Sequence, residues 1–579
     1  MENLTRISIH LNALWGELPS EIGLMTSLTY LHVGGNKFNG SLPTELGLLT
    51  RMEKMFTKVN SFTGSLPTEL LMLTNMDTMQ FFENAFSGSL PTELGLLTSL
   101  TALEISENPF NGTLPSELGR LTNLDRLTLW YNRFTGPLPS ELGMLTKMTY
   151  FGCYRNAFNG SLPSELGMLT DWGEMFFYGN AFTGSIPTEL GMLTSMKGIY
   201  LFQNALTGTL PSELGLLSNM TDLQVARNSL SGSVSTALGL LTHVKKLYLF
   251  DNAFTGSLPS ELGLMTSLSR LELDANSFSG PIPYQLGMLT SLASLYLSEN
   301  SFTGSLPSTL GNLISMERMY MAGNAFTGSL PSEFGLLTNI KILDLSQNSL
   351  HGSLPSTELG RLVNITSLDL WGNSLSGSLP TEAGLLTQLT VLSLRSNLLD
   401  GRLPSEVGLL TQLSGLWLND CSFSGALPSE LGLMESLEIL NLSNNSFAGL
   451  VISELGQLSN LRQLDLSSSP PSLRGPFPFD SLPSGLGSLD ISGSPGLICI
   501  SIFPSLLSAV PGSGSRQHAS EIGLMESLQT LNLRNNSFLG LVISDLGQLG
   551  NLQELDLSVS PPSLQGPFLL ISCPAAWVT

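Results

Sequence analysis

The residues of this 579-residue chain that could act as nucleophiles, acids, bases or metal ligands form no recognisable catalytic arrangement. The five histidines show no metal-ligand spacing, and the four cysteines form no CxxC pair. The sequence contains no phosphate-binding loop, no G-x-S-x-G or H-E-x-x-H motif and no kinase catalytic loop. We therefore expect a protein that is not an enzyme and that uses no cofactor and no metal.

Aromatic and basic side chains follow a spacing that suits binding. Nine of the ten tyrosines stand at positions expected to point outward from short strands. Aromatic and arginine side chains are the usual anchors of interfaces. The candidate ligand-binding residues are Trp130, Tyr131, Tyr154, Arg155, Phe176, Tyr178, Tyr200, Phe202, Arg227, Tyr248 and Phe250. The alternative is that aromatic residues stand there because they favour strands, with no ligand involved.

The element that must position these residues is a 24-residue repeat. Asparagine recurs at this step without interruption from Asn12 to Asn348. After an inserted Thr357 the series resumes one residue late at Asn373 and later passes through Cys421. Each asparagine stands in the pattern L-x-x-L-x-L-x-x-N-x-F, and a fixed period of this length indicates a repeat architecture.

The first half of a unit is expected to be a strand followed by a turn. Because side chains alternate along a strand, Leu127 and Leu129 should face inward, while Thr128 and Trp130 face outward. Asn132 follows where the chain must turn. If its amide is buried, backbone groups of adjacent units must satisfy it.

The second half of the unit is expected to bend and then form one helical turn. Phe134 should fill the interior and Gly136 should permit a tight bend. Ser140 suits an N-cap, Glu141 a helix N-terminus and Gly143 a helix end. Stacked units then predict an α/β solenoid, a right-handed superhelix with a concave parallel β-sheet and short 3-10 or helical turns on the convex side.

A family pattern, N-x-L/F-x-G-x-I/L-P-x-x-L-G-x-L, is carried by NRFTGPLPSELGML at 132–145 and by its counterparts at 180–193 and 276–289. On this pattern about 475 residues resemble plant-type leucine-rich-repeat proteins, such as the ectodomains of receptor-like kinases and receptor-like proteins, and inhibitors of cell-wall enzymes. The resemblance implies ligand binding on the concave side and an extracellular or cell-surface location. Such relatives usually carry a signal peptide, paired cysteines at both ends and often a membrane helix or kinase domain, and none of these is visible in the sequence.

The regular pattern is expected to end at a proline-rich break. Residues 1–475 should form the regular solenoid, 476–519 a degenerate repeat and linker, 520–568 a duplicated stub, and 569–579 a tail. The stub nearly repeats the stretch that begins 91 residues earlier. Because that offset is not a multiple of 24, it favours a late duplication or an error in the gene model.

The acidic charge is expected to lie mostly on the helical-turn side. Seventeen of the 46 acidic residues are glutamates at the starts of these turns, so 29 acidic residues remain against 24 basic ones, a balance of −5. The total charge of −22 argues against nucleic acids and anionic membranes as partners of the whole molecule. No apolar stretch reaches the ~20 residues of a membrane span.

The function that these features favour is a non-enzymatic scaffold that recognises a protein, peptide or glycan on the concave sheet. One alternative is a surface-binding structural protein, because the repeated T/S-G-S-L-P-S/T edge forms a regular hydroxyl array that could match ice or a wall polysaccharide. Another, implied by the resemblance alone, is an inhibitor of a secreted enzyme.

Overall fold

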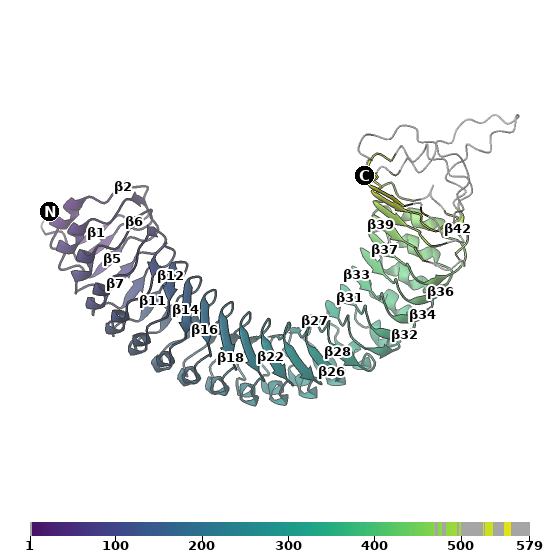
Figure 1. Cartoon of the computed structure of the whole chain (residues 1–579), viewed down its shortest axis with the longest axis horizontal. Helices are drawn as coiled ribbons and strands as arrows, with labels where there is room; N and C mark the ends of the chain where they lie inside the picture. Colours follow the sequence, from purple (N-terminus) through teal and green to yellow (C-terminus); the bar gives the residue numbers. More distant parts are fainter. Residues whose placement is uncertain are drawn as a thin grey trace. The chain divides into compact units, whose positions relative to one another are not determined.

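The computed structural model describes residues 3–468, 473–477, 482–494, 497–498, 525, 527–536, 549–556 and 558. The chain divides into two compact units, Met1–Leu292 and Ala293–Thr579, which are taken in turn. Figure 1 shows the same layering within each unit, with strands on one side and short helical turns on the other. We call these sides the strand face and the turn face.

The strand face of unit 1 is a parallel sheet with one three-residue strand per repeat. Its strands pair in the register that the 24-residue period requires, so that Leu127 lies between Leu103 and Phe151. The strands are β1 (Arg6–Ser8), β3 (Tyr30–His32), β5 (Lys54–Phe56), β7 (Thr78–Gln80), β9 (Ala102–Glu104), β11 (Arg126–Thr128), β13 (Tyr150–Gly152), β15 (Glu174–Phe176), β17 (Gly198–Tyr200), β19 (Asp222–Gln224), β21 (Lys246–Tyr248) and β23 (Arg270–Glu272).

A second series of strands follows the asparagine of each repeat in unit 1. The repeat pattern predicts a bend here, so these strands are an addition to the predicted unit. They are β2 (Trp15–Glu17), β4 (Lys37–Asn39), β6 (Thr63–Gly64), β8 (Ala85–Phe86), β10 (Asn111–Gly112), β12 (Arg133–Gly136), β14 (Ala157–Ser161), β16 (Ala181–Gly184), β18 (Ala205–Gly208), β20 (Ser229–Gly232), β22 (Ala253–Gly256) and β24 (Ser277–Gly280).

The turn face of unit 1 consists of 3-10 turns of five residues each. They are η1 (Ser20–Leu24), η2 (Thr44–Leu48), η3 (Thr68–Met72), η4 (Thr92–Leu96), η5 (Ser116–Arg120), η6 (Ser140–Met144), η7 (Ser164–Met168), η8 (Thr188–Met192), η9 (Ser212–Leu216), η10 (Thr236–Leu240), η11 (Ser260–Leu264) and η12 (Tyr284–Met288).

Unit 2 repeats this plan. Its strand-face strands are β25 (Ser294–Tyr296), β27 (Arg318–Tyr320), β29 (Ile342–Asp344), β31 (Ser367–Asp369), β33 (Val391–Ser393), β35 (Gly415–Trp417), β37 (Ile439–Asn441), β39 (Gln463–Asp465), β41 (Ser488–Asp490), β43 (Thr530–Asn532) and β44 (Glu554–Asp556). The second series comprises β26 (Ser301–Ser305), β28 (Ala325–Thr327), β30 (His351–Gly352), β32 (Ser374–Ser378), β34 (Leu398–Arg402), β36 (Ser422–Gly425), β38 (Ser446–Phe447), β40 (Gly475–Pro476) and β42 (Leu497–Ile498). The turns are η13 (Ser308–Asn312), η14 (Ser332–Leu336), α1 (Ser356–Leu359), η15 (Thr381–Leu385), η16 (Ser405–Leu409), η17 (Ser429–Leu433) and η18 (Ser453–Gln457).

The core of each repeat is made by the inward leucines and the phenylalanine that follows the asparagine. Leu127, Leu129 and Phe134 are completely buried. Phe134 stacks between Phe110 and Phe158 at centroid distances of 6.2 and 5.8 Å. The predicted leucine-rich-repeat solenoid, with a parallel sheet on one side and short 3-10 or helical turns on the other, is therefore confirmed in each unit.

The buried asparagine links two consecutive repeats of the chain, as expected. The Nδ2 amide of Asn132 donates to the carbonyls of Ile105, Leu129 and Trp130 at 3.0–3.3 Å. Its Oδ1 accepts the N–H of Phe110 at 3.2 Å. One side chain thus satisfies four backbone groups at the point where the strand ends.

Two expectations about the turns are wrong. Ser140 is not an N-cap, since Pro139 holds that position and no side chain caps η6; the Ser140 hydroxyl donates to the Glu141 carboxylate instead, at 3.3 Å. Gly143 does not end η6, which continues to Met144. Its role is steric, because a Cβ there would lie 2.5 Å from the carbonyl oxygen of Glu165 in the next turn.

The inserted Thr357 changes the type of one turn. The turn that contains it, α1, is the one α-helix among the described residues. Leu359 N–H bonds to the carbonyl of Pro355, four residues back, whereas the matching bond in η6 spans three residues. The extra residue is therefore accommodated by a wider turn, and the strands on either side keep their pairing.

The C-terminal segments are described only in part. In the described residues β43, from the expected stub, pairs in parallel with β41 and so extends the strand face of unit 2. Residues 499–524 and the tail at 569–579 lie outside the described residues. The segment boundaries at 475, 519 and 568 stay a prediction.

Candidate ligand-binding surface

Four predicted residues form a continuous ring stack on the strand face of unit 1. Trp130, Tyr154, Tyr178 and Phe202 each stand two residues after a strand, in four consecutive repeats. Their successive ring centroids are 5.4, 4.6 and 4.4 Å apart, with interplanar angles of 8°, 15° and 9°. The spacing of neighbouring strands, ~4.8 Å, matches that of stacked rings.

A second column of rings lies beside the stack. Phe176 and Tyr200 are register partners on β15 and β17, with centroids 4.8 Å apart. Tyr150 continues the column at 5.9 Å from Phe176 and meets Trp130 edge to face at 6.0 Å. Together with Tyr131, which meets Tyr154 edge to face at 5.7 Å, these rings and the stack form one patch, which we call the aromatic patch.

Small residues beneath the aromatic patch make room for the rings. A Cβ at Gly198 would lie 2.6 Å from Cε2 of Tyr200, and one at Gly152 would lie 3.3 Å from Cε3 of Trp130. Thr128, expected to face outward, is instead 1% exposed and pairs with Gly152 across the strands. Outward strand positions are therefore of two kinds. Some carry the aromatic rings, and others hold small residues that lie beneath the rings.

Arginine side chains border the aromatic patch. The guanidinium of Arg126 lies 4.9 Å from the centroid of Tyr150, and that of Arg155 lies 5.0 Å from Tyr131. Both distances are within the range of a cation–π contact. The border is therefore cationic, and its two charges are held in place by the rings.

Burial keeps the hydroxyls of the aromatic patch protonated. It raises the pKa of Tyr200 to about 12, and the carboxylates of Asp222 and Glu174 push in the same direction. Burial also raises the pKa of Tyr154, with neighbouring tyrosines adding to the effect. At neutral pH these phenols can therefore donate hydrogen bonds to a ligand.

The structure does not bring all the candidate residues together. Tyr248 contacts Phe250 at 6.4 Å and the guanidinium of Arg227 lies 5.6 Å from Phe250. Between this group and the aromatic patch runs β19, where Gln224 is the register partner of both Tyr200 and Tyr248. The candidate residues thus form an aromatic patch and a separate smaller group, two strands away.

Another aromatic group lies at the first repeats, and none of its residues is among the predicted candidates, although Tyr30 is one of the tyrosines expected to point outward. His32 stacks on His10 at 4.2 Å and contacts Phe56 at 5.0 Å, while the guanidinium of Arg6 lies 3.7 Å from the centroid of Tyr30. Burial, then the charges of His10 and nearby cations, lower the pKa of His32 to about 4. The signal was available, because these residues stand at the same outward positions of earlier repeats.

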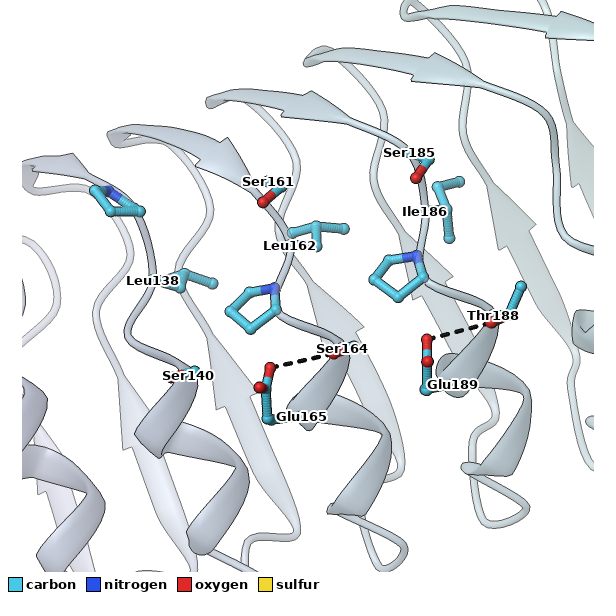
Figure 2. Close-up of a pocket in the computed structure, with 13 residues that line it drawn as sticks. Leu138, Ser140, Ser161, Leu162, Ser164, Glu165, Ser185, Ile186, Thr188 and Glu189 are labelled. Atoms are coloured by element: carbon cyan, nitrogen blue, oxygen red, sulfur yellow. Dashed lines mark hydrogen bonds between the residues drawn. The ribbon is translucent and has the colours of Figure 1, made fainter.

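The edge between the second strands and the 3-10 turns carries a shallow groove of about 660 Å³, shown in Figure 2. Its lining includes the hydroxyl array noted in the sequence. Ser164 and Thr188, the hydroxyls that follow the proline, donate to the carboxylates of Glu165 and Glu189 at 3.3 Å, so these two hydroxyls are engaged within their own turns.

Other kinds of site find no support in the described part of the chain. No group of three or more His, Cys, Asp or Glu side chains there could hold a metal ion. No helix within the described ranges is long and apolar enough to cross a bilayer.

Comparison with known proteins matches this fold. A model described as a leucine-rich repeat region matches residues 329–473, and one for single leucine-rich repeats matches residues 27–49, 99–121, 291–313 and 527–549. Among curated proteins the chain has no significant match.

Solved structures of plant receptors resemble the chain over most of its length. The TDR receptor is 28% identical over 96% of this chain and 93% of its own, with a TM-score of 0.84. The plant peptide hormone receptor RGFR1, solved with RGF2, is 29% identical over 97% and 95%, with a TM-score of 0.74. The Arabidopsis receptor kinase HAESA, solved with the peptide hormone IDA and the co-receptor SERK1, is 30% identical over 85% and 86%, with a TM-score of 0.70. The chain belongs to the plant-type leucine-rich-repeat family.

Proposed function

We propose that this chain is a non-catalytic recognition scaffold that binds a peptide segment on the strand face of unit 1. The observation that carries the proposal is the aromatic patch, whose rings are half-buried and stand outside the core. Half-exposed aromatic rings bordered by arginines are typical of binding hot spots. The likeness to receptors solved with peptide hormones supports the same class of ligand.

The orientation of the rings favours a peptide over a glycan. Within the ring stack each inner face is covered by the next ring, as the 4.4 Å separation of Tyr178 and Phe202 shows. A sugar ring binds aromatics through an open ring face, whereas the stack offers ring edges and phenol hydroxyls. Edges carry the positive end of the ring quadrupole and complement carbonyl oxygens, which a peptide main chain supplies at every residue.

A selection experiment tests this function. A displayed library of random 12-residue peptides would be selected against the full chain, and the enriched peptides measured by fluorescence anisotropy. In the double variant Tyr178→Ala/Phe202→Ala we expect binding to weaken at least tenfold, the loss typical of hot-spot residues.

The matched control is Tyr296→Ala/Tyr320→Ala, which removes a comparable stacked pair, 4.9 Å apart, from unit 2. It should leave peptide affinity unchanged and shift the thermal midpoint about as much as the first variant. Full affinity in Tyr178→Ala/Phe202→Ala, or the absence of any enriched peptide, would contradict the proposal.

The hydroxyl edge is a weaker candidate for function. A surface-binding role needs hydroxyls that are free to match a lattice, but those of Ser164 and Thr188 are turned to carboxylates of their own turns. The aromatic patch therefore remains the better-supported site.

A further inference from the structure

The turn face of unit 1 carries a row of exposed apolar side chains that the core does not use. Eleven of its twelve 3-10 turns end on a leucine or methionine, each between 40 and 71% exposed. We call this set the outer apolar row. Its members are Leu24, Leu48, Met72, Leu96, Met144, Met168, Met192, Leu216, Leu240, Leu264 and Met288.

The fold does not require an apolar residue at this position. In η5 and η13 the same place holds Arg120 and Asn312, and both turns close in the ordinary way through the N–H of the residue that follows. The adjacent residue, such as Leu145 after η6, is completely buried and supplies the core contact. The apolar side chains of the row thus face solvent without a packing reason.

In two repeats of unit 2 the residue at the row position is polar, and an exposed aliphatic side chain stands two residues later. Two residues after Asn312 stands Ile314, which is 60% exposed, where most repeats have threonine. Two residues after Arg361 stands Val363, which is 49% exposed. These two repeats thus have an exposed aliphatic side chain close to the polar row position, whereas η5 and η18 have Thr122 and Ser459 at the corresponding place. Isolated exposed leucines need no explanation, but a contiguous row marks an interaction surface.

A row of carboxylates runs beside the outer apolar row. Ten of the twelve turns carry a glutamate three residues before the row position, and Arg120 is the single basic residue within these turns. Figure 2 shows two of these glutamates, Glu165 and Glu189, each held by the hydroxyl before it. Neighbouring turns approach each other closely, since a Cβ at Gly143 would lie 2.5 Å from the carbonyl oxygen of Glu165. The apolar row is interrupted at Arg120, and the glutamate row at Ala237 and Gln285.

We propose that the outer apolar row and its glutamates form a second binding surface, which docks a basic amphipathic helix of a partner protein. Such a helix presents an apolar stripe flanked by lysines or arginines, which complement the two parallel rows. The methionines at 144, 168 and 192 adapt their shape to different apolar ridges.

The charge of this face selects against other occupants. A second copy of the chain would bring another glutamate row and a net charge of −22 against the first. An anionic bilayer would be repelled by the same carboxylates. The surface is separate from the aromatic patch, so a peptide ligand and a helical partner can bind at the same time.

The probe for this surface is an 18-residue helical peptide of leucine and lysine, with a leucine and glutamate peptide of the same pattern as its counterpart. Full-length protein should bind the Leu/Lys peptide and not the Leu/Glu peptide, as measured by fluorescence anisotropy. In the variant Met168→Asn/Met192→Asn/Leu216→Asn the dissociation constant should rise at least tenfold. Asparagine is chosen because Asn312 shows that the turn accepts it, so the thermal midpoint should stay unchanged.

Two variants that each lose three negative charges distinguish binding at this surface from a general attraction of the basic peptide to an acidic protein. Neutralising Glu165, Glu189 and Glu213 to glutamine should weaken Leu/Lys peptide binding at least fivefold. Neutralising three exposed acids away from the turns, Glu83→Gln/Glu107→Gln/Asp251→Asn, should leave it within twofold. Equal losses in both variants would overturn the proposal.

Other outcomes would also overturn it. Undiminished peptide binding by the triple asparagine variant would show that the outer apolar row takes no part. Sedimentation of the wild type with phosphatidylcholine vesicles, lost in that variant, would assign the row to lipid. A dimer in sedimentation velocity that the variant abolishes would assign it to a second copy.

Discussion

Asp369 on β31 is a carboxyl whose protonation is coupled to folding. Burial raises its pKa from 3.8 to about 6, and Asp344, its register partner on β29, acts in the same direction. The Trp371 N–H, which donates to Asp369 Oδ1 at 3.2 Å, opposes the shift only in part. The folded state therefore binds a proton more tightly than the unfolded chain does.

This coupling gives a pH-dependent prediction for Asp369→Asn. As the pH rises from about 4 through 6, the wild type loses stability because its folded carboxyl must ionise in a partly buried place. Asparagine removes that penalty and keeps an acceptor for Trp371. At pH 7.5 the variant should be more stable by on the order of 1 kcal/mol, a value reduced because the carboxyl keeps some contact with water.

Urea unfolding followed by circular dichroism at pH 7.5 and at pH 4 checks the sign. The difference between wild type and variant should nearly vanish at pH 4, where the Asp369 carboxyl is protonated in the folded state. A variant less stable than the wild type at pH 7.5 would refute the assigned cause.

A left-handed backbone position that recurs through the framework also carries some of the candidate site residues. Tyr131, Arg155 and Arg227 adopt left-handed φ angles of 53–55° where Gly179 has 66° in an intervening repeat. A left-handed conformation costs a residue other than glycine about 1–2 kcal/mol. Their side chains therefore leave the strand face from a sharp turn, which strand alternation does not predict.

At the scale of elements, the close stacking of 3-10 turns depends on one glycine per repeat. Gly143→Ala would place its Cβ 2.5 Å from the Glu165 carbonyl oxygen, which is backbone and cannot rotate away. We expect a loss of about 1–3 kcal/mol, the usual range for overpacking. Chemical denaturation measures it. Gly173→Ala is the matched control, because a Cβ there meets nothing within 4 Å, and its cost should be far smaller. Equal losses would show that turn contact is not the cause.

The repeat-forming elements could be predicted from sequence because their causes are local and periodic. The inward Leu127, the buried Asn132 amide and the ring of Phe134 all follow from alternation, the 24-residue step and the need to satisfy buried groups. The second strands and the role of Gly143 could not be predicted, because both arise from the approach of a neighbouring turn. That contact is fixed by the stacking distance, which one repeat in isolation does not encode.

The sequence predicts which residues of the candidate site share one face, but it does not predict which of their rings are in contact. Spacing alone placed Tyr154, Tyr178 and Phe202 on one face. It did not show that Gln224 on β19 separates the rings of Tyr200 and Tyr248, nor that Tyr150 leans over Gly152 to join the aromatic patch. Whether neighbouring rings meet depends on rotamers and on the small residues beneath them.

At the scale of the whole molecule, hydrogen bonds and strand pairing join each described repeat to its immediate neighbours. The side-chain amide of Asn132 reaches 27 residues back to Ile105, and its Oδ1 reaches 22 residues back to Phe110. In such a chain stability is close to a sum of repeat and interface contributions. A destabilising substitution in one repeat should therefore also destabilise the adjacent repeats, and the loss of stability should decrease with distance along the chain.

Leu127→Ala tests this locality. Leu127 is completely buried between Leu103 and Phe151, so its truncation should cost about 2–5 kcal/mol in its own repeat. Native-state hydrogen exchange should then show faster exchange of the amides in β9, β11 and β13. The amides of β1 and β3, and those of unit 2, should keep their protection, because the strands that pair with Leu127 are β9 and β13. If protection instead falls evenly along the chain, folding is globally cooperative, and the aromatic patch and the outer apolar row cannot be altered independently of one another.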